Sequence, residues 1–196
     1  MASPVPSLNL THGQVLWTLS RGTSSEQRLV DQARYLRLLG VPFRKSELGR
    51  GRGNRVCYRY EHLIELGVAV WALERGLKPQ EVAEFLIEKR KFLRPLYAKA
   101  FADQSEKAIK AEWVKSRGRI VPLLGDEIFL RLHDRYSEAP GRIEVLEQPE
   151  IKSLSDFFML AERYPGEKTR TLLPLTRLAL ELVAWAREAP EVKPGP

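Results

Sequence analysis

Arginine side chains are concentrated in one short part of this chain. Ten of its 32 Lys and Arg residues lie between Arg21 and Arg59, against three acidic residues, so this segment carries +7, which equals the net charge of the whole chain. Nine of the ten are arginine. The planar guanidinium group pairs in a two-pronged manner with phosphate and with guanine edges. The segment therefore predicts the recognition of a polyanion, and nucleic acid fits this pattern best.

These arginines form two groups. Arg28, Arg34 and Arg37 have the spacing of a helix, whereas residues 50–55 read Arg-Gly-Arg-Gly-Asn-Arg. Glycines in such a loop let the backbone approach DNA closely and adopt positive φ, and the intervening arginines suit phosphates or a narrow minor groove. We predict that the three arginines of this loop contact DNA.

The elements around the arginines predict a winged helix-turn-helix. A short apolar helix pattern covers residues 11–20, and Ser24 or Ser25 can cap a second helix that Gly40 ends. Residues 43–47 and 56–60 predict a hairpin around the glycine loop. Further helices are predicted over residues 61–76 and from Pro79 onwards, where Pro95 should kink or end the helix. In this arrangement the second helix enters the major groove, and Arg28 and Gln32 can bond in a two-pronged manner to guanine and adenine.

Three segments resemble MerR-type transcriptional regulators. Residues 32–41 (QARYLRLLGV) are similar to their "LRYYExxGLL" segment, Arg55 to Tyr58 to their wing "GYRLY", and residues 60–82 to the helix pair that follows the wing. The resemblance covers residues 11–90. It implies that Tyr35, Arg55 and Tyr58 hold phosphates and that the helix from Pro79 onwards pairs with its mate in a dimer.

The predicted sites follow from these two lines of reasoning. The tyrosines at positions 35, 58 and 60 can alternatively be core residues with their hydroxyls at the surface. The apolar stripe over residues 82–96 can alternatively belong to the core of a single chain. The predicted DNA-binding residues are Ser25, Gln27, Arg28, Gln32, Arg34, Tyr35, Arg37, Arg50, Arg52, Arg55 and Tyr58. The predicted dimerisation residues are Phe85, Lys89, Phe92, Leu93 and Leu96.

The C-terminal part has a different character. Residues 128–132 and 142–146 predict two strands, and residues 153–163 and 174–187 predict two helices. The expected fold is therefore mainly α with a small β part. We predict a disordered N-terminus at 1–10, a MerR-like winged-helix domain at 11–94, a helical linker or dimerisation segment at 95–118, a small α+β domain of unknown role at 119–188, and a disordered tail at 189–196.

Charge and composition narrow the function further. Residues 1–118 hold 21 basic and 12 acidic side chains, whereas residues 119–196 hold 11 and 13, so the second half is not expected to bind nucleic acid. The one cysteine, Cys57, predicts no internal disulfide and reads as a small buried hydrophobe in a strand. Three scattered histidines predict no metal site, and no cofactor is expected. Without an apolar stretch long enough to span a bilayer, the chain is expected to be cytoplasmic.

Together these features predict a sequence-specific, DNA-binding transcriptional regulator without catalytic activity. Its expected partners are double-stranded DNA, a second copy of the chain, and RNA polymerase or another regulator. Two alternatives remain open. One is an architectural or excisionase-like protein that bends DNA, and the other is an adaptor module whose basic face meets an acidic protein.

Overall fold

The computed structural model describes residues 5–21, 26–44, 47, 56–102, 129–132, 143–146 and 171–191. These residues are mainly helical and form five helices and three short strands. The chain divides into two compact units, one made of residues 5–95 and 180–196 and the other of residues 1–4 and 96–179. The sequence prediction grouped residues 119–188 into one domain, whereas the structure assigns residues 180–188 to the unit that holds the N-terminal helices.

The first helix, α1 (His12–Ser20), begins where the sequence predicts it. Thr11 is its N-cap, and its hydroxyl accepts a hydrogen bond from the Gln14 amide while the Gln14 side chain accepts one from the Thr11 amide. This reciprocal capping box satisfies two amides that the first turn would otherwise leave unpaired. Val15 and Leu19 form the buried face of the helix.

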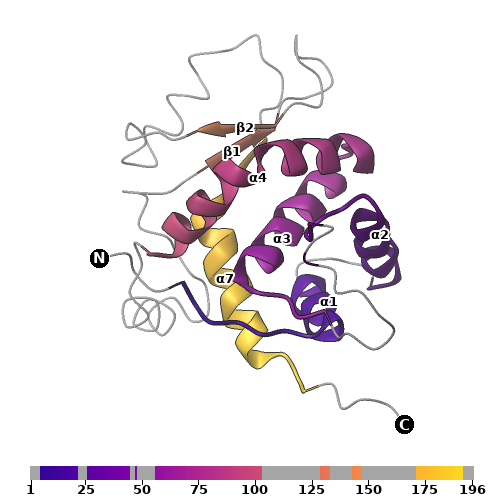
Figure 1. Ribbon diagram of the computed structural model, residues 1–196, viewed down its shortest axis with the longest axis vertical. Helices are drawn as coiled ribbons and strands as arrows, with labels where there is room; N and C mark the ends of the chain where they lie inside the picture. Colours follow the sequence, from indigo (N-terminus) through magenta and orange to yellow (C-terminus); the bar gives the residue numbers. More distant parts are fainter. Residues whose placement is uncertain are drawn as a thin grey trace. The chain divides into compact units, whose positions relative to one another are not determined.

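The second helix, α2 (Glu26–Leu38), packs against α1 and α3 (Figure 1). Leu29, Ala33 and Leu36 are buried and recur at the helical period, as the sequence predicts. Gly40 has φ +96° and ends this segment. A left-handed residue after a helix is a common way to satisfy the last carbonyls, and the Val41 amide here donates to the Leu36 carbonyl at 2.9 Å.

The third helix, α3 (Tyr60–Glu74), is buried at every position except Glu61 and Glu74. A helix that is apolar on nearly all sides belongs in a core, and Glu65 is a carboxylate buried there. Gly76, with φ +87°, follows the end of the helix, and Pro79 is the first residue of α4 (Pro79–Ala102). Both positions agree with the predicted helix signals.

Of the two expected effects of Pro95, a kink or an end of the helix, the end is wrong. Helix α4 continues through this residue to Ala102. A proline inside a helix removes one amide donor and crowds the preceding turn. Leu93 and Leu96, on either side of Pro95, are both buried, and their burial stabilises the continuous helix against that local cost.

The segments on either side of the predicted glycine loop pair differently from the expected hairpin. Of the first segment, Phe43, Arg44 and Glu47 are described, and none of them is in a strand. In the second, Tyr58 forms an isolated antiparallel bridge with Leu10, and the two amides and two carbonyls exchange hydrogen bonds of 2.9 Å. The Tyr58 side chain is buried, so the preceding side chain of this extended segment points the other way. Cys57 is exposed, and its predicted burial is therefore wrong.

The other unit contains a three-stranded antiparallel sheet. Strands β1 (Phe129–Leu132) and β2 (Ile143–Leu146) pair with Phe129 opposite Leu146, which confirms the two predicted strands. A third strand, β3 (Thr171–Pro174), was not predicted and pairs with the other edge of β1, giving the order β2-β1-β3. Helix α7 (Leu175–Glu188) follows β3 directly and agrees with the helix predicted over residues 174–187. The helix predicted at 153–163 and most of the predicted linker lie outside the described residues.

Candidate nucleic-acid interface

Helix α2 presents a polar face opposite its buried side chains. Successive residues of a helix are separated by about 100°, so Gln27, Asp31, Arg34 and Leu38 form a ridge about 60° wide. All four are exposed. On the same basis Arg28 and Arg37, also exposed, lie at the two margins of this face, and Gln32 is half-buried. The predicted arginines of this helix are therefore all accessible, but they do not point in one direction.

The ridge itself has a mixed chemical character. Gln27 Nε2 donates to Asp31 Oδ1 at 3.2 Å, so an acidic group occupies the middle of the helix surface. Leu38, at the C-terminal end of the ridge, is 77% exposed. The ridge therefore contains one positive residue, Arg34, together with an acidic residue and an exposed apolar residue. The other two arginines of the helix lie at the margins of the polar face.

Tyr35 connects α2 to the beginning of α4. It is 40% exposed, and its hydroxyl accepts a hydrogen bond of 2.7 Å from Gln80 Nε2. A phenol hydroxyl that accepts one bond still has its own proton to donate. Tyr35 can therefore donate to an external acceptor such as a phosphate oxygen while Gln80 restrains its ring.

Tyr58 has a different environment. Its side chain is 1% exposed, and its hydroxyl lies 2.9 Å from His12 Nδ1. Burial raises the pKa of the Tyr58 phenol, with nearby Arg37 opposing the shift, and burial together with Arg37 lowers the pKa of His12. The ring also packs edge-on against Phe43, with 4.7 Å between centroids. These contacts agree with the interpretation of Tyr58 as a core residue. We therefore leave Tyr58 out of the proposed DNA-contacting surface.

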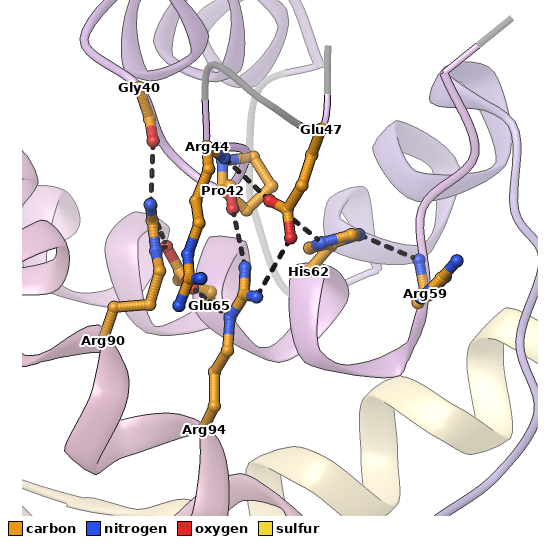
Figure 2. A network of polar contacts seen from close by, with 9 residues as sticks. All are labelled: Gly40, Pro42, Arg44, Glu47, Arg59, His62, Glu65, Arg90 and Arg94. Atoms are coloured by element: carbon orange, nitrogen blue, oxygen red, sulfur yellow. Dashed lines mark hydrogen bonds and ion pairs between the residues drawn. The ribbon is translucent and has the colours of Figure 1, made fainter. Parts of the chain in front are cut away.

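A polar network lies where the chain leaves α2 and meets α3 and α4 (Figure 2). Arg90 donates from Nε and Nη2 to Glu65 Oε1 at 2.9 and 2.6 Å, and from Nη2 to the Gly40 carbonyl at 2.8 Å. Both charged residues are buried. Burial raises the pKa of the Glu65 carboxyl, and the hydrogen bonds from Arg90 oppose that shift by stabilising the carboxylate. The named members of this polar network are Gly40, Pro42, Arg44, Glu47, Arg59, His62, Glu65, Arg90 and Arg94.

Arg94 extends the network by one helical turn. It donates from Nη1 to Glu47 Oε1 and from Nη2 to the Pro42 carbonyl, both at 3.2 Å, and its Nε lies 3.7 Å from Glu65 Oε2. The other Glu47 oxygen accepts a hydrogen bond of 2.7 Å from the Arg44 amide. Partial burial would raise the pKa of Glu47, but the bonds from Arg94 and the Arg44 amide outweigh it and lower the pKa to about 2.

His62 links the network to the start of α3. Its Nδ1 accepts a hydrogen bond of 3.2 Å from the Arg59 amide, so the neutral ring carries its proton on Nε2. That nitrogen faces Glu47 Oε2 at 3.8 Å, which is longer than a hydrogen bond. Burial lowers the pKa of His62 and favours this neutral form. Phe43 packs against the imidazole, with 4.6 Å between ring centroids.

The Glu47 carboxylate predicts an acid-dependent loss of stability. Its pKa falls from 4.5 to about 2 on folding, so its contribution is present above about pH 4.5 and is lost as the pH falls toward 2. We expect Glu47→Gln to flatten the pH dependence of the urea unfolding midpoint in this window. Arg94→Met should flatten it only in part, because the Arg44 amide still donates to the carboxylate, and it should add nothing to Glu47→Gln in the double variant. Additive effects of the two substitutions would show that Arg94 does not cause the shift.

The sequence prediction missed the buried part of this network. Glu65 stands alone among the apolar residues of α3, and Arg90 and Arg94 are spaced four apart on α4. This pattern could have indicated a buried ion pair, because an isolated carboxylate on an apolar helix needs a positive partner. Of the predicted DNA-binding residues, Ser25, Arg50, Arg52 and Arg55 lie outside the described residues.

The predicted dimerisation residues divide into two groups on α4. Leu93 and Leu96 are buried within the chain. Phe85 is half-buried, Lys89 is exposed and Phe92 is 51% exposed. Only these last three side chains leave surface for a second copy of the chain.

In the described ranges, no helix combines the length and apolar character needed to cross a membrane. Comparison of the chain with protein-family models, with curated proteins and with solved structures found no match.

Proposed function

We propose that the chain is a sequence-specific, DNA-binding transcriptional regulator whose N-terminal part, over residues 11–94, is a MerR-like winged helix-turn-helix. In this proposal α2 enters the major groove, and Arg50, Arg52 and Arg55 form a wing on the backbone or the minor groove. A homodimer would place two such helices on successive turns of a pseudo-palindromic site. RNA polymerase or another regulator would be the protein partner.

The accessible arginine face of α2 carries this proposal. Arg28, Arg34 and Arg37 are all exposed: Arg34 lies opposite the buried side chains of the helix, and Arg28 and Arg37 lie at the two margins of its polar face. Among the described residues, no ion pair involves any of the three arginines. Exposed guanidinium groups can bind an external anion, and an α-helix fits the major groove of B-DNA.

Position along the helix assigns different roles to these side chains. The N-terminal turns of a recognition helix reach base edges, which favours Gln27 and Arg28 as base contacts. Arg34 and Arg37 lie further along and suit phosphates, which position the protein without reading sequence. Tyr35 joins them, because its hydroxyl proton is available while Gln80 holds the ring.

The first test is the salt dependence of binding to duplex DNA. Six of the predicted DNA-contacting residues are arginines; with Arg28 assigned to a base edge, phosphate contacts by the other five predict an affinity loss of roughly 500-fold between about 50 and 200 mM salt. Fluorescence anisotropy with a labelled randomised duplex measures this directly. A change of less than about tenfold over this range would contradict the proposal, since such a loss corresponds to fewer than two phosphate contacts.

A second test separates base contacts from backbone contacts. We expect Arg28→Ala to relax the preference at one base pair by about 1–3 kcal/mol, whereas Arg52→Ala should weaken binding to all sequences alike. Selection from a randomised duplex pool, followed by titration of single-base variants, measures both effects. The reverse pattern would exchange the roles of helix and wing.

One observation favours a second candidate, the protein-binding adaptor. Leu38 is 77% exposed on the same ridge as Asp31, two helical turns away, and neither an apolar nor an acidic side chain binds phosphate. This candidate predicts no salt-dependent shift of duplex DNA at physiological ionic strength. Leu38→Asp would then abolish partner binding, whereas the regulator proposal predicts that a folded Leu38→Asp variant still binds DNA.

A further inference from the structure

Two guanidinium groups on α4 hold the chain at the point where it leaves α2. Arg90 donates to the Gly40 carbonyl and Arg94 to the Pro42 carbonyl, at 2.8 and 3.2 Å. The two arginines are four residues apart and therefore lie on the same side of the helix. As Figure 2 shows, both side chains extend from α4 toward the turn after α2. The exit of the proposed recognition helix is thus fixed by a neighbouring helix at two carbonyls, those of residues 40 and 42.

Glu65 anchors both arginines from inside the protein. It is 1% exposed, accepts two hydrogen bonds from Arg90 and lies 3.7 Å from Arg94 Nε. Replacing a buried ion pair with apolar residues of similar size is often neutral or stabilising. Overall stability is therefore a weak explanation for this ion pair. A better explanation is that the pair favours one particular arrangement of the helices around it.

That arrangement concerns the orientation of α2. Gly40 has φ +96°, a left-handed conformation that favours glycine. A Cβ added to Gly40 would lie 3.4 Å from Ile87 Cδ1 on α4. Gln80, at the start of α4, holds the Tyr35 hydroxyl. Residues on α4 thus restrain α2 near its C-terminal end and at the turn that follows it, while its outer face remains exposed.

We propose that Arg90 and Arg94, through Glu65, are positioning residues that set the angle at which α2 meets DNA and thereby determine its sequence discrimination. This inference rests on the proposed function. Neither arginine needs to touch DNA, because each acts on α2 through a backbone carbonyl. A helix released from these carbonyls would keep its exposed arginines and its general affinity for phosphate, but it would lose a fixed register against the base edges.

The experiment compares folded variants by their discrimination between duplexes. The full-length wild-type chain selects its preferred sequence from a randomised duplex pool, and the readout is the affinity ratio between that duplex and a scrambled one. Arg94→Met and the double variant Glu65→Leu/Arg90→Met should each lower this ratio about tenfold or more, comparable to a mismatch in the site. Binding to the scrambled duplex should change less than the ratio does.

Lys91→Met is the matched control. Lys91 is exposed on the same helix, and its replacement removes the same charge. We expect this variant to keep the wild-type ratio. Arg94→Lys retains the charge but not the two-pronged geometry, so it should behave like Arg94→Met. A ratio restored by Arg94→Lys would show that charge alone matters and would overturn the positioning role.

Hydrogen exchange provides a readout that needs no DNA. If the arginines position the exit of α2, the Gly40 and Val41 amides should exchange faster in Arg94→Met and in the double variant than in Lys91→Met. Unchanged exchange together with an unchanged ratio overturns this inference and leaves the proposed function intact. If the wild-type chain binds no duplex, the proposed function is wrong. Faster exchange in the variants would then show that the two arginines hold the exit of α2 without a role in DNA recognition.

Discussion

Glu65→Leu should destabilise the N-terminal helical unit by about 3–5 kcal/mol, because it leaves the Arg90 guanidinium buried without its carboxylate. Arg90→Met should cost a similar amount by stranding Glu65. Whole proteins of this size are stable by only about 5–15 kcal/mol, so either change removes a large part of the total. Urea unfolding followed by tryptophan fluorescence, to which Trp17 and Trp71 of this unit contribute, measures the loss.

The double variant is the control for this prediction. Glu65→Leu/Arg90→Met removes both charges and should recover most of the stability lost in either single variant. Additive losses in the double variant would mean that the two residues do not form the buried pair seen at 2.6 Å.

Leu36→Ala should cost about 2–5 kcal/mol, since its side chain is fully buried and the substitution leaves a cavity beneath α2. Leu38→Ala is the matched control. It makes the same substitution two residues further along the same helix, where the side chain is 77% exposed, and should change the stability by less than about 0.5 kcal/mol.

This pair of leucines tests the rotation of α2 about its axis. The same rotation decides which arginines face outward, so the proposed interface depends on it. Equal losses for Leu36→Ala and Leu38→Ala would mean that the helix is turned differently, and the roles given to Arg28, Arg34 and Arg37 would have to be reassigned.

Local signals in the sequence predicted the helical frame well. Gly40 and Gly76 both adopt positive φ after helices, and Pro79 begins α4. These residues act through their own backbone preferences, which do not depend on the rest of the fold. The apolar spacing of Leu29, Ala33 and Leu36 likewise gave the buried side of α2 correctly.

Features that depend on distant parts of the chain could not be predicted in this way. Tyr58 pairs with Leu10, and no property of either residue specifies that partner. Strand β3 is only four residues long, and its pairing with β1 depends on chain segments far from it in sequence. Continuation of α4 past Pro95 reflects packing on both sides of the proline. In each case tertiary contacts override a local preference.

The candidate site shows the same division. Exposure of the α2 arginines followed from the helical period, whereas the ion pair between Glu65 and Arg90 joins residues 25 positions apart. An isolated glutamate on an apolar helix signals that a partner is needed but does not say where it lies. The predicted phosphate contact of Tyr58 came from a resemblance in sequence. In the structure the Tyr58 side chain is buried, and its hydroxyl lies within hydrogen-bond distance of His12.

The bridge between Leu10 and Tyr58 has a practical consequence for preparing shortened forms of the protein. Its two backbone hydrogen bonds join the residue just before α1 to the segment that leads into α3. A truncation that starts after Leu10 would leave the Tyr58 amide and carbonyl without their backbone partners. Recombinant versions should therefore retain Leu10, and a purification tag is better joined upstream of it than in its place.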